Sequence, residues 1–327
     1  MVQRPIVAAT VFNRLLTRTR LKQLQLVMLT AELGSTQSAA HELGMSQPAA
    51  SKAISELEAL LQTALFQRHA RGMTPTAACL EILPLLRTAV RALNACAESL
   101  AQYGQGGQGM VRVGAVMSSI PGGLGPLLPL FFRQFPKIGV EIVEDILASL
   151  LSRYAEGGLD VILMRRPLQV PTDSHFTPLW NDRYHIIAGP EHPLSKVKRI
   201  SLHRLLSESW ALAPLGTRMR QTFDKILAQL GLPTPETNMV TASLTMFVSY
   251  LQNTSAIAIM PASVVIPFAE RGLISILPVA IDQPIEEIGI LARTKDLPWA
   301  AFQFVEFIKE HKSEVSLATV PLRSGAE

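Results

Sequence analysis

The sequence predicts a multidomain α/β protein with a helical N-terminal part, one long helix and a two-lobed C-terminal part. Three observations indicate this organisation. Residues 35–61 have the pattern of two helices joined by a tight turn, and residues 83–100 repeat apolar side chains every three or four positions. From Met110 onward, strand patterns alternate with helix patterns. A chain of 327 residues is long enough for two or more domains, each with its own core.

Composition indicates a globular protein, and the charge distribution indicates an anionic partner. Hydrophobic residues make up 48% of the chain and charged residues 17%, and no run of 18 apolar residues predicts a transmembrane helix. Residues 1–73 hold eight Lys and Arg against four Glu, whereas the remainder carries 22 residues of each sign. The whole net charge of +4 therefore lies in the first 73 residues, a placement that suits the phosphates of a nucleic acid.

The first 20 residues contain four Arg and no acidic residue. The apolar run Ile6–Phe12 is followed by arginines rather than by a small-residue cleavage site, which argues against a secretory signal. An organelle transit peptide is the alternative for such an Arg-rich start. We interpret the segment as a basic arm that precedes the predicted helices of residues 35–61.

The two cysteines indicate a reduced, cytoplasmic protein. Cys79 and Cys96 lie 17 positions apart on one predicted helix. At 1.5 Å per residue they would be about 25 Å apart, beyond the reach of a disulfide. Both thiols are therefore expected to be free and structural.

Residues 35–44 predict the first helix of a helix-turn-helix and its ending. Ala39, Ala40 and Leu43 recur at helical spacing. Gly44 follows at the position where a left-handed residue ends a helix.

Residues 46–61 predict the second helix. Ser46 offers an N-capping hydroxyl, and Pro48 fits the first turn, where its missing N–H costs nothing. One face of this helix is apolar, formed by Ala50, Ile54, Leu57 and Leu61. Small and polar residues near its start suit entry into a DNA major groove. An ordinary helical hairpin is the alternative interpretation of this window.

Two flanking segments complete a winged domain. Residues 21–33 predict an amphipathic helix, with Leu21, Leu24, Val27, Met28 and Ala31 as its core face. After Leu61, basic residues surround a turn at Gly72 and predict a small wing that follows a phosphate backbone. A basic surface loop is the alternative.

The long helix carries a pairing seam. Leu83, Leu86, Val90, Leu93, Ala97 and Leu100 are spaced 3, 4, 3, 4, 3, which is the period of a coiled coil. This regularity favours pairing with a second copy over a helix packed within its own chain. Pro84 predicts a kink or a break, because an interior proline removes a helical hydrogen bond.

The glycines that follow this helix form a hinge. Residues 104–109 match the dinucleotide-binding pattern G-x-G-x-x-G letter for letter. That site needs a strand before the glycines and a helix after them, and here the order is reversed. The segment is therefore interpreted as a flexible linker.

The C-terminal part is predicted to form two α/β lobes with a cleft between them. Strand patterns occur in MVRVGAV, VEIVED, DVILMR, RYHIIAG and WALAP, with helix patterns between them. Such alternation predicts parallel sheets covered on both faces. The last helix is expected over Trp299–His311.

From about Leu21 to His311 the chain resembles the LysR-type transcriptional regulators. The segment SQPAASKAISELEALLQTALFQRHARGMTPT carries most of this resemblance, supported by VRVGAV and by EHPL after RYHIIAG. The nearest branch resembles galactose-binding-protein and protocatechuate-pathway regulators, judging by GTRMRQTF and the long N-terminal arm. The resemblance implies a winged helix-turn-helix, a dimerising linker helix, and an effector domain similar to type 2 periplasmic binding proteins. It also implies a homodimer, commonly assembled as a homotetramer.

The domain boundaries expected from these patterns and this resemblance cover the whole chain. They are a basic arm at 1–20, a winged helix-turn-helix at 21–75, a linker helix at 76–103, a glycine-rich hinge at 104–109, an effector domain at 110–312 (lobe I about 110–175 and 284–312, lobe II about 176–283) and a tail at 313–327.

Two sets of site residues follow. The resemblance places DNA contacts at Ser46, Gln47, Pro48, Ser51, Lys52, Arg68 and Arg71. Strand ends and helix starts, where N–H groups face an anion, place effector contacts at Ser118, Ser119, Arg165, Thr217, Arg218, Ser243 and Thr245. Each Ser or Thr of the second set has an alternative role as a helix cap. The expected effector is a small anion such as a carboxylate.

A DNA-binding regulator is favoured over two rival classes. No P-loop, G-x-S-x-G or H-E-x-x-H motif occurs, and the seven histidines show no metal-ligand spacing, so no enzyme, cofactor or metal is expected. A binding or transport protein would resemble the C-terminal domain alone, but it would not need the basic N-terminal domain. The expected partners are double-stranded DNA with a pseudo-palindromic operator, the anionic effector and RNA polymerase, with no membrane.

Overall fold

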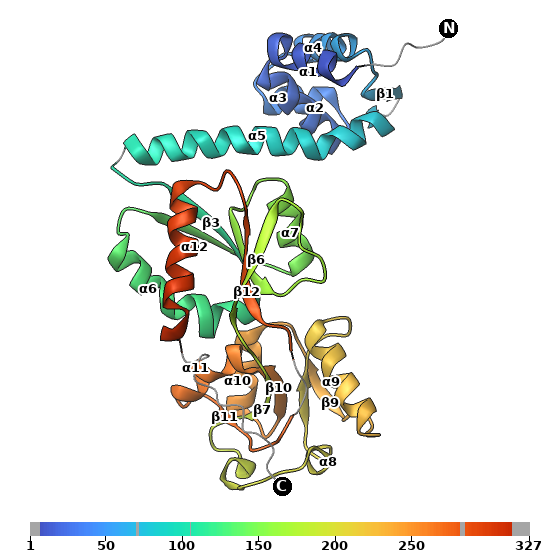
Figure 1. Ribbon diagram of the computed structural model, residues 1–327. Helices are drawn as coiled ribbons and strands as arrows, with labels where there is room; N and C mark the ends of the chain where they lie inside the picture. The colour runs from blue at the N-terminus through green and yellow to red at the C-terminus, as the bar shows by residue number, and fades with distance from the viewer. Residues whose placement is uncertain (1–6, 70–71, 105, 282–284, 316–327) are drawn as a thin grey trace. The chain divides into compact units, whose positions relative to one another are not determined.

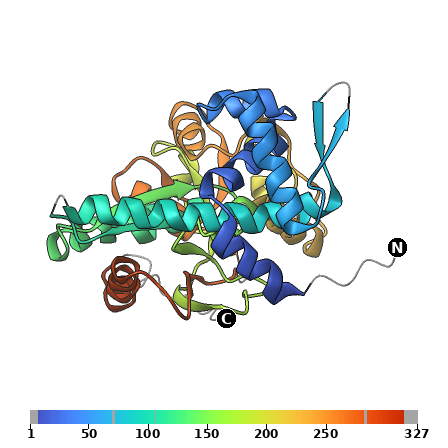
Figure 2. The same cartoon turned by 90° about the horizontal axis from the view of Figure 1, so that it is seen from above.

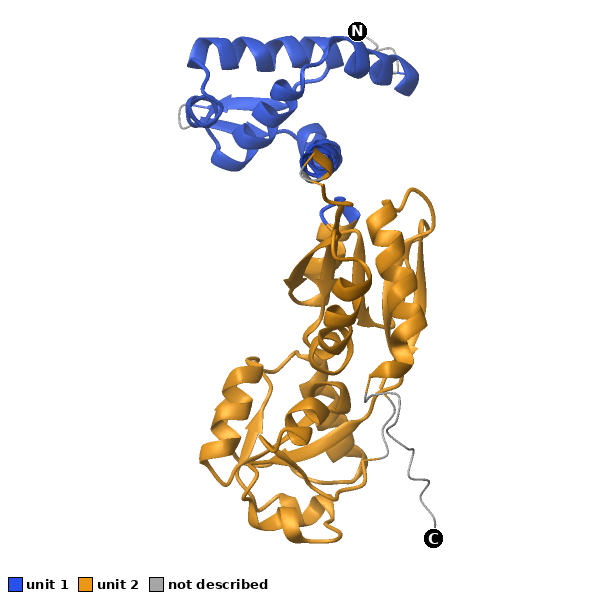
Figure 3. Cartoon of the chain, turned by 90° about the vertical axis from the view of Figure 1, so that its left-hand side faces the viewer, with its two compact units in different colours: residues 1–101, 155–158 blue, residues 102–154, 159–327 orange. Residues whose placement is uncertain are grey.

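The computed structural model describes residues 7–69, 72–104, 106–281 and 285–315 (Figure 1). The chain divides into two compact units. Unit 1 contains residues 1–101 with 155–158, and unit 2 contains residues 102–154 with 159–327 (Figure 3).

Unit 1 consists of helices and one hairpin. Its elements are α1 (Ala8–Arg18), α2 (Leu21–Leu33), α3 (Thr36–Glu42), α4 (Gln47–Leu61), β1 (Phe66–His69), β2 (Gly72–Pro75) and α5 (Ala77–Gly104). The predicted three-helix core forms between α2, α3 and α4. Local signals act as expected, because Gly44 adopts φ 60° after α3 and the Ser46 hydroxyl caps α4.

The core face of α2 differs from the prediction at its first turn. Leu26 and Val27 are fully buried, whereas Leu21 is 53% exposed. Leu21 is the first residue of α2 and lies outside the unit 1 core, which the other four predicted residues join. Helical spacing alone did not show where the covered region begins.

α5 is one continuous helix that passes through Pro84 (Figure 2). Of the kink or break expected at Pro84, the break does not occur. Pro84 is exposed, as are the preceding Leu80 and the following Leu85, so the ring faces solvent rather than a packed neighbour. Along the predicted seam Leu83 is buried in the unit 1 core, while Leu93 is 46% and Leu100 73% exposed.

Unit 2 contains two lobes, each built on a five-stranded sheet. The first lobe has sheet order β4-β3-β5-β12-β6, with β3 (Met110–Ala115), β4 (Gly139–Glu144), β5 (Val161–Arg165), β6 (Ser174–Trp180) and β12 (Ile288–Arg293). The second has order β11-β7-β10-β8-β9, with β7 (Tyr184–Ala188), β8 (Trp210–Leu212), β9 (Thr237–Val240), β10 (Ile257–Pro261) and β11 (Ser275–Ile276).

Helices cover both faces of each sheet. In the first lobe they are η1 (Met117–Ser119), η2 (Ile120–Leu124), α6 (Gly125–Gln134), α7 (Leu147–Ala155), α12 (Trp299–His311) and η4 (Lys312–Glu314). In the second lobe they are η3 (Pro193–Lys196), α8 (Leu202–Leu205), α9 (Arg218–Gln229), α10 (Leu244–Asn253) and α11 (Ala262–Glu270). Consecutive residues of β5 pack alternately into the two cores of the first lobe, which explains its unbroken apolar sequence.

Both sheets are mixed, which corrects the prediction of parallel sheets. β3 runs parallel to β4 and β5, but β12 runs antiparallel to β5 and β6. In the second lobe β8 is parallel to β9 and β10, and β7 is antiparallel to β10 and β11. β12 enters the first lobe from the second, so no crossover helix within its own sheet fixes its direction.

The boundary between the lobes lies a few residues later than expected. β6 belongs to the first sheet, so lobe I extends to Trp180 rather than to residue 175. α11 begins directly after β10 and packs against η1 and η2, which follow β3. The carboxyl ends of parallel strands from both sheets therefore face each other where the lobes meet.

Candidate functional site

The N-terminal end of α4 is exposed and polar. Gln47, Pro48 and Lys52 are exposed and Ser51 is half-buried, whereas Ala50 and Ile54 on the opposite side are buried in the core. Ser46 caps the helix by accepting a hydrogen bond from the Ala49 N–H at 3.4 Å. The five predicted residues of α4 and its cap thus lie together at one end of the helix. The Lys52 ammonium lies 3.9 Å from the Glu56 carboxylate on the solvent side.

The β1–β2 hairpin forms the predicted wing (Figure 2), and a backbone hydrogen bond ties it to the residue that ends α2. The Met73 N–H donates to the Gly34 carbonyl at 2.9 Å. Gly72 has φ 136°, and a Cβ there would lie 2.5 Å from the Gly34 oxygen, so this close approach requires glycine. Arg68 is exposed on β1. Arg71, the other predicted wing residue, lies outside the described residues.

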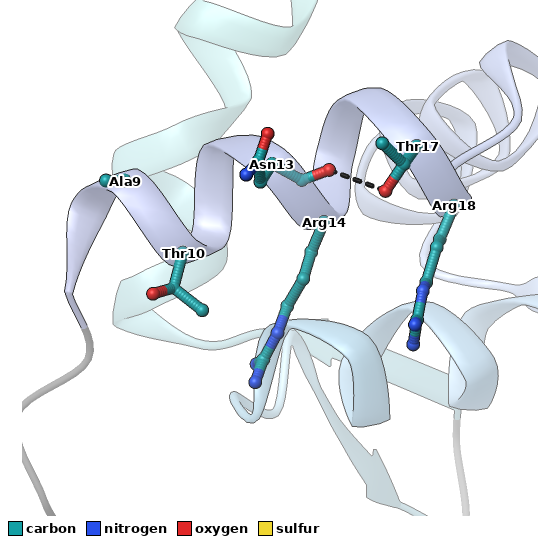
Figure 4. Close-up of a pocket in the computed structure, with 6 residues that line it drawn as sticks. All are labelled: Ala9, Thr10, Asn13, Arg14, Thr17 and Arg18. Atoms are coloured by element: carbon teal, nitrogen blue, oxygen red, sulfur yellow. Dashed lines mark hydrogen bonds between the residues drawn. The ribbon is translucent and has the colours of Figure 1, made fainter.

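Helix α1 occupies most of the segment that was expected to be a basic arm. Val11 and Leu15 pack against the unit 1 core, and Arg14 donates to the Leu60 carbonyl at 3.0 Å, at the C-terminal end of α4. Its polar face lines a pocket that contains no acidic side chain (Figure 4). The lining residues are Ala9, Thr10, Asn13, Arg14, Thr17 and Arg18.

The predicted effector residues lie near the meeting edges of the two lobes, but several are already engaged. Ser118 and Ser119 follow β3 in η1, and both are buried. The Ser119 hydroxyl contacts the carbonyls of Val116 at 2.7 Å and Leu163 at 3.2 Å. Its role here is to hold the turn after β3.

Arg165 ends β5 and belongs to a buried polar network. It pairs with Asp182 at 2.6 Å, and Asp182 also accepts hydrogen bonds from the hydroxyl and the N–H of Ser263, at 2.6 and 3.1 Å. The Asp182 side chain is fully buried and that of Arg165 is 11% exposed. This network joins β5, the segment between β6 and β7, and the start of α11, so Arg165 positions the lobes. Sequence patterns gave no signal for Asp182.

Two hydroxyls at the helix starts of the second lobe cap their helices. Thr217 accepts from the Arg220 N–H at the start of α9, and Ser243 accepts from the Met246 N–H at the start of α10. Thr245 is exposed on the first turn of α10. Arg218 is exposed and pairs with Glu286 at 2.8 Å.

Burial shifts the pKa of two residues that follow Asp182 in the chain. Burial raises the pKa of Tyr184. Burial also lowers the pKa of His185 to about 4, and the nearby Arg183 adds to the shift. The His185 ring is therefore uncharged at neutral pH. Within the described ranges, no three His, Cys, Asp or Glu side chains are grouped as metal ligands would be.

Comparison with protein families matches both parts of the chain. Residues 21–80 match the bacterial regulatory helix-turn-helix protein, lysR family, and residues 104–313 match the LysR substrate binding domain. α1 precedes the first of these matches. In the described part of the chain, no helix has the length and apolar character needed to span a bilayer.

Curated relatives are HTH-type transcriptional regulators. GbpR of Azospirillum brasilense is 26% identical over 275 residues, which cover 84% of this chain and 80% of that protein. GalR of Pseudomonas putida is 28% identical over 278 residues, covering 84% and 69%. CbbR of Xanthobacter flavus is 32% identical over 222 residues, covering 66% and 64%.

Solved structures share the fold. CbnR, described as a LysR family transcriptional regulator, has 20% identity and a TM-score of 0.64, and the match covers 89% of this chain and 99% of that one. Full-length CbnR in complex with its target DNA gives a TM-score of 0.65 at the same identity and coverage. With both parts matched in order, the chain belongs to the LysR family: it is a DNA-binding transcriptional regulator with a helix-turn-helix domain and a substrate-binding domain.

Proposed function

We propose that the exposed end of α4 reads base pairs and that the wing binds the flanking phosphates. The observation that supports this most strongly is the placement of Gln47 and Lys52 on the solvent side of a helix whose opposite side is buried. Gln and Lys side chains suit base edges and phosphates in the major groove. The contacts with DNA would come from Ser46, Gln47, Pro48, Ser51, Lys52, Arg68 and Arg71.

A pair of such domains would recognise a pseudo-palindromic operator. The seam residues Leu93 and Leu100 are exposed on α5, so an apolar surface is left for the α5 of a second copy. A two-fold axis between the copies would place the half-sites about one helical turn apart, or a multiple of that. A homotetramer would arise from two such dimers.

The C-terminal domain would sense a small anionic metabolite between its lobes. Support comes from the strand ends of both lobes meeting beside Ser118, Arg165, Thr217 and Arg218. Ser119, Ser243 and Thr245 complete the proposed set, with Ser119 acting through the turn after β3. Bound effector would shift the equilibrium between two arrangements of the lobes and so change the binding of RNA polymerase to the promoter. Regulation of this kind places the protein in the cytoplasm, with its DNA.

Selection from a random duplex pool tests the DNA-binding part of this proposal. The full-length chain should enrich one inverted-repeat motif over several rounds. Enrichment that does not exceed that of a variant lacking the Gln47 and Ser51 side chains (Gln47→Ala, Ser51→Ala) would contradict it. A thermal-shift screen of small carboxylates on the full chain tests the effector part separately.

A further inference from the structure

We propose that Glu286 is a built-in competitor of the effector. Its carboxylate occupies the Arg218 guanidinium and latches the two lobes together until an effector carboxylate takes its place. This inference rests on the proposed anionic effector, and it adds an internal anion that effector binding must displace.

The backbone of Glu286 belongs to the first lobe. Its carbonyl accepts a hydrogen bond from the Arg165 guanidinium at 2.9 Å. The next carbonyl, that of Glu287, accepts from the Arg166 N–H at 2.8 Å, and Ile288 then pairs with Arg165 as the first residue of β12. These contacts hold Glu286 at the edge of the first sheet, beside the carboxyl end of β5.

Arg218 belongs to the second lobe. It is the first residue of α9, which Thr217 caps and whose Phe223 and Ile226 are buried against the second sheet. The Arg218 Nη1 atom lies 2.8 Å from the Glu286 Oε2 atom. This ion pair therefore runs from one lobe to the other.

Among the described residues, two ion pairs link the lobes, and they differ in their exposure to solvent. The side chains of Arg165 and Asp182 are 11% and 0% exposed, whereas those of Arg218 and Glu286 are 44% and 45% exposed. Separating the buried pair would leave a charge without a partner in the protein interior. The exposed pair can exchange one carboxylate for another at little cost, because water solvates whichever partner is released. The buried pair therefore acts as the pivot and the exposed pair as the latch.

The latch makes effector binding and lobe movement one event. A molecule in which Glu286 occupies Arg218 cannot bind an external carboxylate there. Only the remaining fraction of the protein is competent, and the apparent affinity is the intrinsic affinity multiplied by that fraction. A carboxylate that binds Arg218 releases Glu286 and removes the exposed ion pair between the lobes. A neutral compound of the same shape makes no such exchange.

Full-length variants test this proposal. Glu286→Gln removes the competing charge and keeps the size of the side chain. Glu287→Gln is the matched control, because it breaks the neighbouring exposed ion pair between Arg166 and Glu287, at 2.7 Å. Arg218→Gln removes the proposed anion partner. The probes are the sodium salts of acetate, succinate, citrate and benzoate, with benzamide as the neutral partner of benzoate. The readout is the midpoint, which is the probe concentration that gives half of the maximal thermal shift.

The expected result is a midpoint about two- to five-fold lower in Glu286→Gln than in the wild type for at least one carboxylate, the effect that removal of an exposed ion pair produces. The midpoint should be unchanged in Glu287→Gln, and the shift should be lost in Arg218→Gln and with benzamide. Equal midpoints in wild type and Glu286→Gln, or carboxylate binding that survives Arg218→Gln, would overturn the latch while leaving an anionic effector in place. If no carboxylate binds Glu286→Gln, the anionic effector fails together with the latch.

Discussion

The carboxylate of Glu58 accepts a hydrogen bond from the backbone N–H of Leu65 at 2.7 Å, and the same oxygen accepts from the Phe66 N–H at 3.1 Å. A side chain of α4 thus holds the start of the wing. This contact joins the predicted DNA-reading helix to the predicted phosphate-binding wing, so the Glu58 side chain positions the wing relative to α4.

Glu58→Ala should loosen the wing and lower stability. Two backbone N–H groups would lose their partner, which costs about 1–3 kcal/mol for a buried group and less where water replaces the carboxylate. Urea unfolding followed by far-UV circular dichroism measures the loss, and Ser55→Ala on the exposed side of α4 is the control. DNA affinity should fall equally on specific and scrambled duplexes, and a loss confined to the specific duplex would contradict a role through the wing.

The two cysteines should differ in reactivity by a wide margin. Cys96 is exposed, whereas Cys79 is buried and its pKa is raised to about 11, because burial disfavours the thiolate and the nearby Glu58 charge disfavours it further. In the native protein, titration with a chromogenic disulfide at pH 8 should show one fast thiol. Cys96→Ser should abolish that fast phase. A fast phase that persists in Cys96→Ser would mean that α5 opens where Cys79 lies.

The C-terminal domain should lose stability as the pH falls from about 6.5 to about 4. His185 has its pKa lowered to about 4 in the folded protein, whereas it protonates near its ordinary value of 6.5 when the chain unfolds. The contribution of His185 to the free energy of unfolding is therefore complete above pH 6.5 and is lost as the pH falls to about 4. The loss is about 2 kcal/mol, because the His185 side chain is only partly buried.

Urea unfolding followed by tryptophan fluorescence checks this prediction. The three tryptophans, Trp180, Trp210 and Trp299, all belong to unit 2, so the signal reports that unit. His185→Gln should flatten the slope between pH 6.5 and 4. A slope that matches the wild type would show that other groups cause the acid sensitivity.

Local signals in the sequence predicted the recognition region well. Gly44, Ser46 and Pro48 act within one or two turns of their own position, so their residue types alone were enough to place the turn and the start of α4. The last helix was expected over Trp299–His311 from its apolar spacing, and α12 occupies those residues.

Contacts between distant segments could not be read in the same way. Arg165 was predicted to contact ligand, but its partner Asp182 comes from the segment between β6 and β7, and Ser263 comes from α11. No periodicity links these positions. α1 was missed because its packing residues, Val11 and Leu15, lie in a stretch that its arginines marked as an arm. The mixed sheets were missed because strand direction depends on which lobe a strand enters from.

Fluorescence anisotropy with Gln47→Ala tests the central claim most directly. The full-length variant, the wild type and Arg68→Ala are each titrated onto the selected operator and onto a scrambled duplex of equal length. The expected result is that Gln47→Ala loses about 1–3 kcal/mol on the operator and almost nothing on the scrambled duplex, while Arg68→Ala weakens both alike and reduces the salt slope by about one. Equal losses on both duplexes for Gln47→Ala would contradict direct reading of bases by α4.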